Sequence, residues 1–158
     1  MENQNEISIR FRAVLLDGKW IANTNFKDLL TTLNWQQANK KIGNLNTIAA
    51  LAQHINYYIA GVLNVFEGGN LEIRDQYSFD FPVVESAAGW ASILNNLFSN
   101  AEKFAKHLEQ LSTEKLDQDF VAEKYGSYRR NMDGMIEHCY YHLGQIALLK
   151  KLILEGEQ

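Results

Sequence analysis

His138 and His142 stand four residues apart near the C-terminal end of the sequence, in a segment with helical periodicity. Successive helical residues are rotated by about 100°, so the two imidazoles leave the axis about 40° apart and share one face. Two histidines at this spacing are a common way for one rigid helix to supply two metal ligands. The alternative is that each is a hydrogen-bonded core or boundary residue. Apolar positions surround the pair and direct it toward an interior: Met135, Cys139, Leu143, Ile146 and Leu149.

A third histidine, His54, falls within the apolar face of an earlier predicted helix, between Leu51 and Tyr58. In a helical bundle it could meet His138 and His142 in the core, near one end. Three neutral imidazoles can hold a divalent ion and leave a position open for water or substrate, as catalytic sites do. Nitrogen ligands suit zinc, nickel, iron or copper. Such an ion could lower the pKa of a bound water to roughly 7 or polarise a substrate oxygen or sulfur.

Four neighbours of the pair have less specific roles. Gln145, three residues after His142, is predicted to hydrogen-bond at the edge of the site, or else to be a surface amide. Gly144 could let a neighbouring element approach closely, or could simply be a tolerated helix glycine. Glu137 is expected to be a solvated charge, and Cys139 to pack in the core.

The elements that would position these residues are helices. Pro82 is the only proline among 158 residues, and the alternation typical of strands is scarce, so an all-α fold is predicted. Four long amphipathic helices are expected over about residues 5–16, 47–66, 84–111 and 127–154. In a chain of this length they predict a four-helix bundle in a single domain, residues 1–158. His107 lies opposite the apolar stripe of its helix, so we assign it to solvent, with no ligand role.

Three irregular segments join these helices. Residues 19–46 are predicted to be a connector with short helical pieces, and residues 112–126 a turn region. Residues 68–85 form a linker long enough to cross the end of a bundle, where such loops often line a site. Four aromatic residues in these segments could line a substrate pocket, although packing explains large aromatics at least as well: Trp20, Trp35, Tyr77 and Phe79.

Composition narrows the classes of function. Apolar residues make up 46% and charged residues 22% of the chain, which is ordinary for a globular protein. The formal charge is −4 and the cationic residues are scattered, so no nucleic acid partner is expected. A polar start, Met1–Asn5, and the lack of a long apolar run argue against a signal peptide and a membrane span, so a cytoplasmic location is expected. Cys139 is the only cysteine, which excludes an internal disulfide and an all-thiolate zinc site.

Two segments together resemble a known family. The histidine of Thr47–Ile55 and the His-x-x-x-His-x-Gly-Gln-Ile pattern of His138–Ile146 are similar to those of the DinB/YfiT-like superfamily. The resemblance extends over most of the chain, including the number and order of helices and the long linker. It implies a four-helix bundle, frequent homodimers and a three-histidine site for a divalent metal ion, either nickel or zinc. Iron is a further candidate because nitrogen ligands also suit it. The ligands of this site would be His54, His138 and His142.

The resemblance also implies a range of activities. Characterised members include transferases of low-molecular-weight thiols such as bacillithiol, a mycothiol-dependent isomerase and metal-dependent hydrolases. We therefore predict an enzyme in which a metal-bound thiolate or hydroxide attacks a small electrophile, by S-transfer or hydrolysis. The first alternative is a non-catalytic protein that binds a metal or a small ligand. The second is a structural helical module whose histidines hydrogen-bond within the core.

Overall fold

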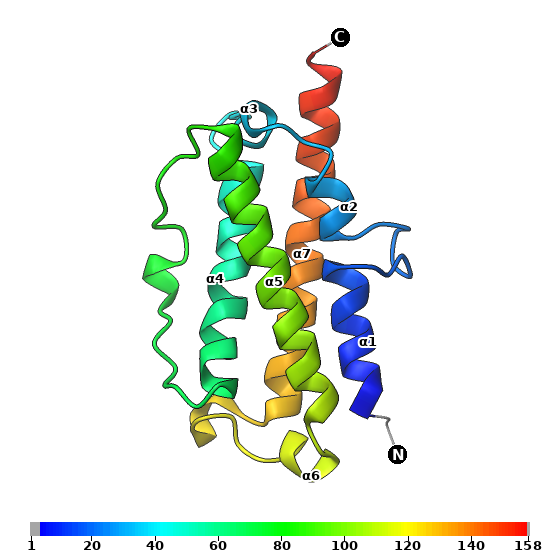
Figure 1. Cartoon of the computed structure of the whole chain (residues 1–158), viewed down its shortest axis with the longest axis vertical. Helices are drawn as coiled ribbons and strands as arrows, with labels where there is room; N and C mark the ends of the chain where they lie inside the picture. The colour runs from blue at the N-terminus through cyan, green and yellow to red at the C-terminus, as the bar shows by residue number, and fades with distance from the viewer. Residues whose placement is uncertain (1–3, 158) are drawn as a thin grey trace.

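The computed structural model describes residues 4–157, so most of the polar start of the chain lies outside the described residues (Figure 1). Its regular structure is helical, which confirms the all-α prediction. The long helices are α1 (Gln4–Leu15), α4 (Ile48–Phe66), α5 (Ala87–Gln110) and α7 (Tyr128–Glu155). The shorter ones are α2 (Phe26–Leu30), α3 (Trp35–Ala38), η1 (Asp75–Tyr77), α6 (Thr113–Leu116) and η2 (Glu123–Tyr125).

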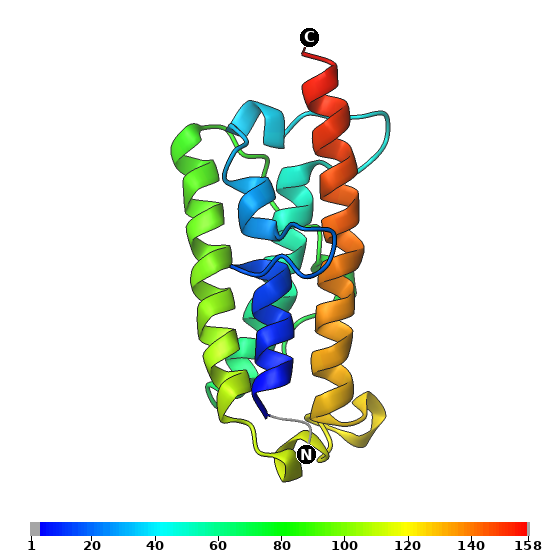
Figure 2. The same cartoon turned by 90° about the vertical axis from the view of Figure 1, so that its right-hand side faces the viewer.

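The four long helices form a square bundle. Helix α1 packs on α5 and α7, and α4 packs on the same two helices from the other side (Figures 1 and 2). Helices α1 and α7 run upward in Figure 1, whereas α4 and α5 both run downward. Helices α4 and α5 are therefore parallel neighbours, which requires a long connection to carry the chain back between them.

Short polar side chains set where the helices begin. Thr47, Ser86 and Ser127 each accept a hydrogen bond from a backbone N–H in the first turn of α4, α5 and α7. Asn25 and Asn34 do the same for the short helices α2 and α3. These residues satisfy N–H groups that have no partner within the helix. The short helical pieces expected in residues 19–46 are therefore real.

The core is formed by the facing apolar stripes of the bundle. Phe11 of α1 and Phe104 of α5 are fully buried, with ring centroids 4.6 Å apart. The indole N–H of Trp90 donates to the carbonyl of Leu33, which ties the α2–α3 connector to α5. The assignment of His107 to solvent was wrong: its ring is half-buried and stacks on Phe66, 5.5 Å away between centroids. The apolar stripe of α5 does not predict this contact, because it is made by Phe66, a large aromatic residue on the neighbouring helix α4.

From its length, the linker of residues 68–85 was expected to cross the end of the bundle. Instead it runs along the side of the bundle, next to α4 (Figure 1). The hydroxyl of Tyr57 accepts from the backbone N–H of Arg74 and donates to its carbonyl, at 2.8 and 3.1 Å. At Gly61 an added Cβ would stand 2.1 Å from a methyl carbon of Ile73. The linker is thus seated directly on α4. In residues 4–157, no helix combines the length and apolarity needed to cross a bilayer.

Candidate metal centre

The structure brings His54, His138 and His142 together. His54 lies on α4, and His138 and His142 lie one turn apart near the middle of α7. The cluster therefore sits at mid-height of the bundle, where α4 and α7 face each other, and not near one end as expected. His54 and His142 are each 6% exposed, and His138 is half-buried. Within the described residues, this is the group of histidine, cysteine and acidic side chains that could hold a metal ion.

Outer hydrogen bonds hold two of the three rings. The Nδ1 of His54 lies 3.0 Å from the carbonyl oxygen of Ser78, and the Nδ1 of His142 lies 2.7 Å from Oε1 of Gln145. Both partners are acceptors, so each Nδ1 carries the proton and each Nε2 keeps a lone pair. Carbonyl partners of this kind commonly fix the tautomer and the orientation of metal-binding histidines.

The three Nε2 atoms converge on one point. The Nε2 of His138 is 3.1 Å from that of His54 and 2.9 Å from that of His142. The Nε2 atoms of His54 and His142 are both acceptors, so a single proton on Nε2 of His138 can satisfy only one of them. Imidazole ligands lie about 2.0–2.1 Å from a zinc ion, which places neighbouring nitrogens about 2.9–3.4 Å apart. These two separations match that spacing, and all three nitrogens lie within 4.8 Å of one another, so the donor set suits a divalent ion.

The surroundings keep the rings neutral. Burial is the main cause that lowers the pKa of His54 and of His142 below the ordinary value. Burial, followed by the neighbouring His142 and His54, lowers the pKa of His138 to about 4. Neutral imidazole is the form that binds metals. The cluster is thus in its metal-binding protonation state at neutral pH.

Aromatic rings enclose one side of the cluster. Phe79 of the linker stacks on His54 with ring centroids 4.0 Å apart and planes 8° from parallel. Tyr58 meets His54 and His138 edge-on, each at 5.1 Å. Of the four aromatics suggested as pocket lining, Phe79 is thus the one at the site. Trp35 packs against the core, Tyr77 is half-exposed on η1, and Trp20 is 89% exposed in a groove on the opposite face of α7.

The neighbours of the pair differ in what they do. Gln145 hydrogen-bonds His142, as predicted for a residue at the edge of the site. Gly144 is exposed, and a Cβ there would meet nothing within 4 Å, so it does not permit a close approach. Glu137 is exposed, as expected for a solvated charge. Cys139 is fully buried, and burial raises the pKa of its thiol far above the ordinary value.

The sequence predicted that the linker lines the site, but not the hydrogen bonds that it makes there. Ser78 supplies a backbone carbonyl to His54, and its own hydroxyl donates to the carbonyl of Asp75. The carboxylate of Asp75 accepts a hydrogen bond of 2.7 Å from the hydroxyl of Tyr58. A backbone carbonyl leaves no trace in residue type, so no signal could have pointed to Ser78. The dense run of aromatic and acidic residues in the linker was the one available hint.

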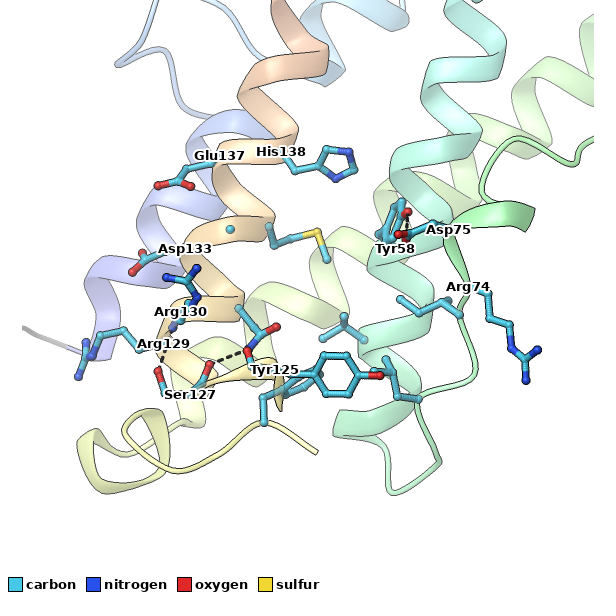
Figure 3. Close-up of a pocket in the computed structure, with 17 residues that line it drawn as sticks. Tyr58, Arg74, Asp75, Tyr125, Ser127, Arg129, Arg130, Asp133, Glu137 and His138 are labelled. Carbon is cyan, nitrogen blue, oxygen red and sulfur yellow. Dashed lines mark hydrogen bonds between the residues drawn. The ribbon is translucent and has the colours of Figure 1, made fainter. Parts of the chain in front are cut away.

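A cavity of about 940 Å³ opens beside His138, between α4, α7, the linker and the segment before α7 (Figure 3). In Figure 3 the ring of His138 points across this space toward Tyr58 and Asp75 on the other wall. The histidine cluster is therefore accessible from one side. A small molecule entering the cavity would reach His138 first.

The fold and the site define a class: a helical-bundle protein with a three-histidine cluster that could hold a metal ion. The sequence profile of the DinB superfamily matches residues 22–146. The chain therefore belongs to the DinB superfamily, and the family resemblance is confirmed. No curated protein and no solved structure matches the chain.

Proposed function

We propose that this protein is a divalent-metal-dependent enzyme whose ion is held by His54, His138 and His142. The observation that carries the proposal is the convergence of three Nε2 atoms, two of which are fixed as acceptors by Ser78 and Gln145. Zinc or nickel suits this nitrogen-only donor set best, with iron as a third candidate. Bound there, such an ion would stabilise a thiolate or hydroxide near neutral pH and polarise a substrate atom.

The chain's own residues supply the positioning. Gln145 and the carbonyl of Ser78 orient His142 and His54, and Phe79 closes the outer face of His54. The cavity beside His138 gives a small-molecule substrate access to the cluster. The reaction we propose is transfer of a low-molecular-weight thiol, similar to bacillithiol, to a small electrophile, or hydrolysis at the same centre. The thiol must come from solution, because the sulfur of Cys139 is fully buried.

Elemental analysis of tag-free protein after dialysis without chelator tests the metal site. We expect close to one zinc, nickel or iron per chain in the wild type and none in His138→Ala. Circular dichroism of the variant confirms that it is folded. The protein loaded with that metal would then be screened for thiol transfer and for ester and amide hydrolysis. Absence of metal after reconstitution with each ion would contradict the proposal, whereas stoichiometric metal without turnover would favour the non-catalytic binding protein.

We further propose that two copies of the chain associate through the groove on the α1 side of α7. Ile9, Trp20 and Ile21 are 60%, 89% and 48% exposed around this groove, an unusual concentration of open apolar surface. Glu6 also lines this groove, as does Arg10, which pairs with Asp133, so both signs of charge lie beside the apolar residues. Sedimentation equilibrium should give a dimer for the wild type and a monomer for Trp20→Ser. A monomeric wild type at high micromolar concentration would overturn this.

A further inference from the structure

We infer that the cavity beside His138 binds a neutral organic molecule with an apolar body and one hydrogen-bond donor, the donor being held by the carboxylate of Asp75. The inference rests on the proposed function, since it places the reacting end of the substrate next to the metal site. It adds the location of the substrate, its chemical class and the residue that recognises it.

Apolar side chains from several elements line the cavity. Helix α4 contributes Val62, the linker Leu71 and Ile73, and α7 Met135. Phe120 and Tyr125 close the far end, and Figure 3 shows the Tyr125 ring lying across the space below His138. Apolar area removed from water here would drive binding of a hydrocarbon or aromatic body.

Most charges around the cavity do not face into it. Asp133 pairs with Arg10 of α1 at 2.7 Å, and Arg129 pairs with Asp117 at 3.1 Å. In Figure 3, Asp133 and Glu137 point away from the His138 side of α7, and Arg74 points outward from the linker. Arg130 also lines the cavity, but it is exposed and therefore solvated. A charged ligand would exchange its hydration for few inward-facing partners of opposite sign, which is costly.

Asp75 is the exception. One of its carboxylate oxygens accepts from Tyr58, and both side chains face His138 across the cavity (Figure 3). An ionised carboxylate is an acceptor only, with room for further hydrogen bonds. A hydroxyl, thiol or neutral amine on the ligand could donate to it. An ammonium group there would lie beside the divalent ion that we propose, so a neutral donor fits best.

A glycine keeps the space open. Gly134 lies four residues before His138, on the same face of α7, and lines the cavity. A Cβ there would meet nothing within 4 Å, so no close packing requires glycine. Glycine inside a helix costs about 1 kcal/mol relative to alanine. A binding site gives this cost a physical reason, because any larger side chain would project into the cavity.

Titrations followed by amide NMR test the inference, with benzyl alcohol as the neutral donor, toluene as its donor-free analogue and benzoate as the anion. Each is added to the protein as purified and after chelation. We expect benzyl alcohol to bind saturably and to shift resonances of α4, α7 and the linker around the cavity. Asp75→Ala should weaken benzyl alcohol about fivefold and toluene less than twofold. Asp80→Ala, an exposed aspartate on the same linker, should change neither.

Gly134→Phe should weaken both neutral probes at least tenfold. Gly144→Phe is the matched control. Gly144 is also exposed on α7, and a Cβ there would meet nothing within 4 Å, but it lines the groove on the α1 side of α7. Unchanged binding in Gly134→Phe would overturn the location. Equal losses for both probes in Asp75→Ala, or tighter binding of benzoate, would overturn the ligand class. If elemental analysis finds no metal but benzyl alcohol still binds after chelation, the proposed function fails and this inference stands.

Discussion

At the scale of single residues, the site depends on side chains that touch the histidines from outside. Gln145 accepts the Nδ1–H of His142 at 2.7 Å, while a backbone carbonyl does this for His54. The two supports differ in one practical way. A mutation can remove the amide of Gln145, but no side-chain change removes the carbonyl of Ser78.

Gln145→Leu is therefore expected to weaken zinc binding about 10- to 100-fold, the usual effect of losing a residue that orients a ligand. Competition with a chromophoric chelator measures this. Gln145→Glu keeps an acceptor oxygen and should retain most of the affinity. Gln110→Leu, at an exposed position of α5, controls for loss of a surface amide. Wild-type affinity in Gln145→Leu would show that His142 needs no external support.

Cys139 offers a second test at this scale. Its thiol is fully buried and burial raises its pKa, so the reactive thiolate does not form at neutral or mildly alkaline pH. Ellman's reagent at pH 8 should label less than a tenth of the native protein, and one thiol per chain in guanidinium chloride. Rapid labelling of the native protein would contradict the burial and would reopen Cys139 as a reactive sulfur.

At the scale of elements, the linker is the part of the fold that completes the site. It lies along α4, is pinned by Tyr57 and Tyr58, and brings Ser78 and Phe79 to His54. This seat requires a residue without a side chain at Gly61, because Ile73 occupies the position of a Cβ. Disturbing that contact should therefore act on the histidines from a distance.

Gly61→Ala is expected to destabilise the protein by about 1–3 kcal/mol, the typical cost of overpacking, and to weaken metal binding. Gly144→Ala makes the same change in a helix with nothing within 4 Å, so it should stabilise by about 0.5–1 kcal/mol. Urea unfolding of both variants measures the opposite signs. If Gly61→Ala also stabilises, the linker is not seated on α4 as described.

At the scale of the whole molecule, a bound ion would join α4 to α7, two helices that are far apart in sequence. An ion that binds only the folded state stabilises it by about 4 kcal/mol when its concentration is a thousand times Kd. For a chain of this size, 1 kcal/mol corresponds to about 2–4 °C in Tm. Removing the metal should thus lower Tm by about 8–16 °C.

Calorimetry of the wild type before and after EDTA checks this, with excess zinc added back to restore Tm. His138→Ala should melt at the same temperature in all three conditions. A wild type that is equally insensitive to EDTA, with metal still absent by elemental analysis, would favour the structural module over the metal site.

Local signals in the sequence were sufficient for the helices and for the paired histidines. The apolar spacing of α4, α5 and α7 and the caps at Thr47 and Ser127 depend only on residues within a turn of each other. The shared face of His138 and His142 follows from the same helical geometry. The fold class and the shared face of His138 and His142 were therefore predictable from local signals. His54 was predicted as the third member from its place in the apolar face of its helix and from the family resemblance.

Tertiary structure decided the rest, because it depends on contacts between segments distant in sequence. The approach of His54 to α7, the carbonyl of Ser78, the pairing of Tyr58 with Asp75 and the stacking of His107 on Phe66 all join different elements. The course of the linker along α4 depends on how Gly61 and Ile73 fit together. Helical periodicity describes one element at a time, so it carries no information about which faces meet or what closes over them.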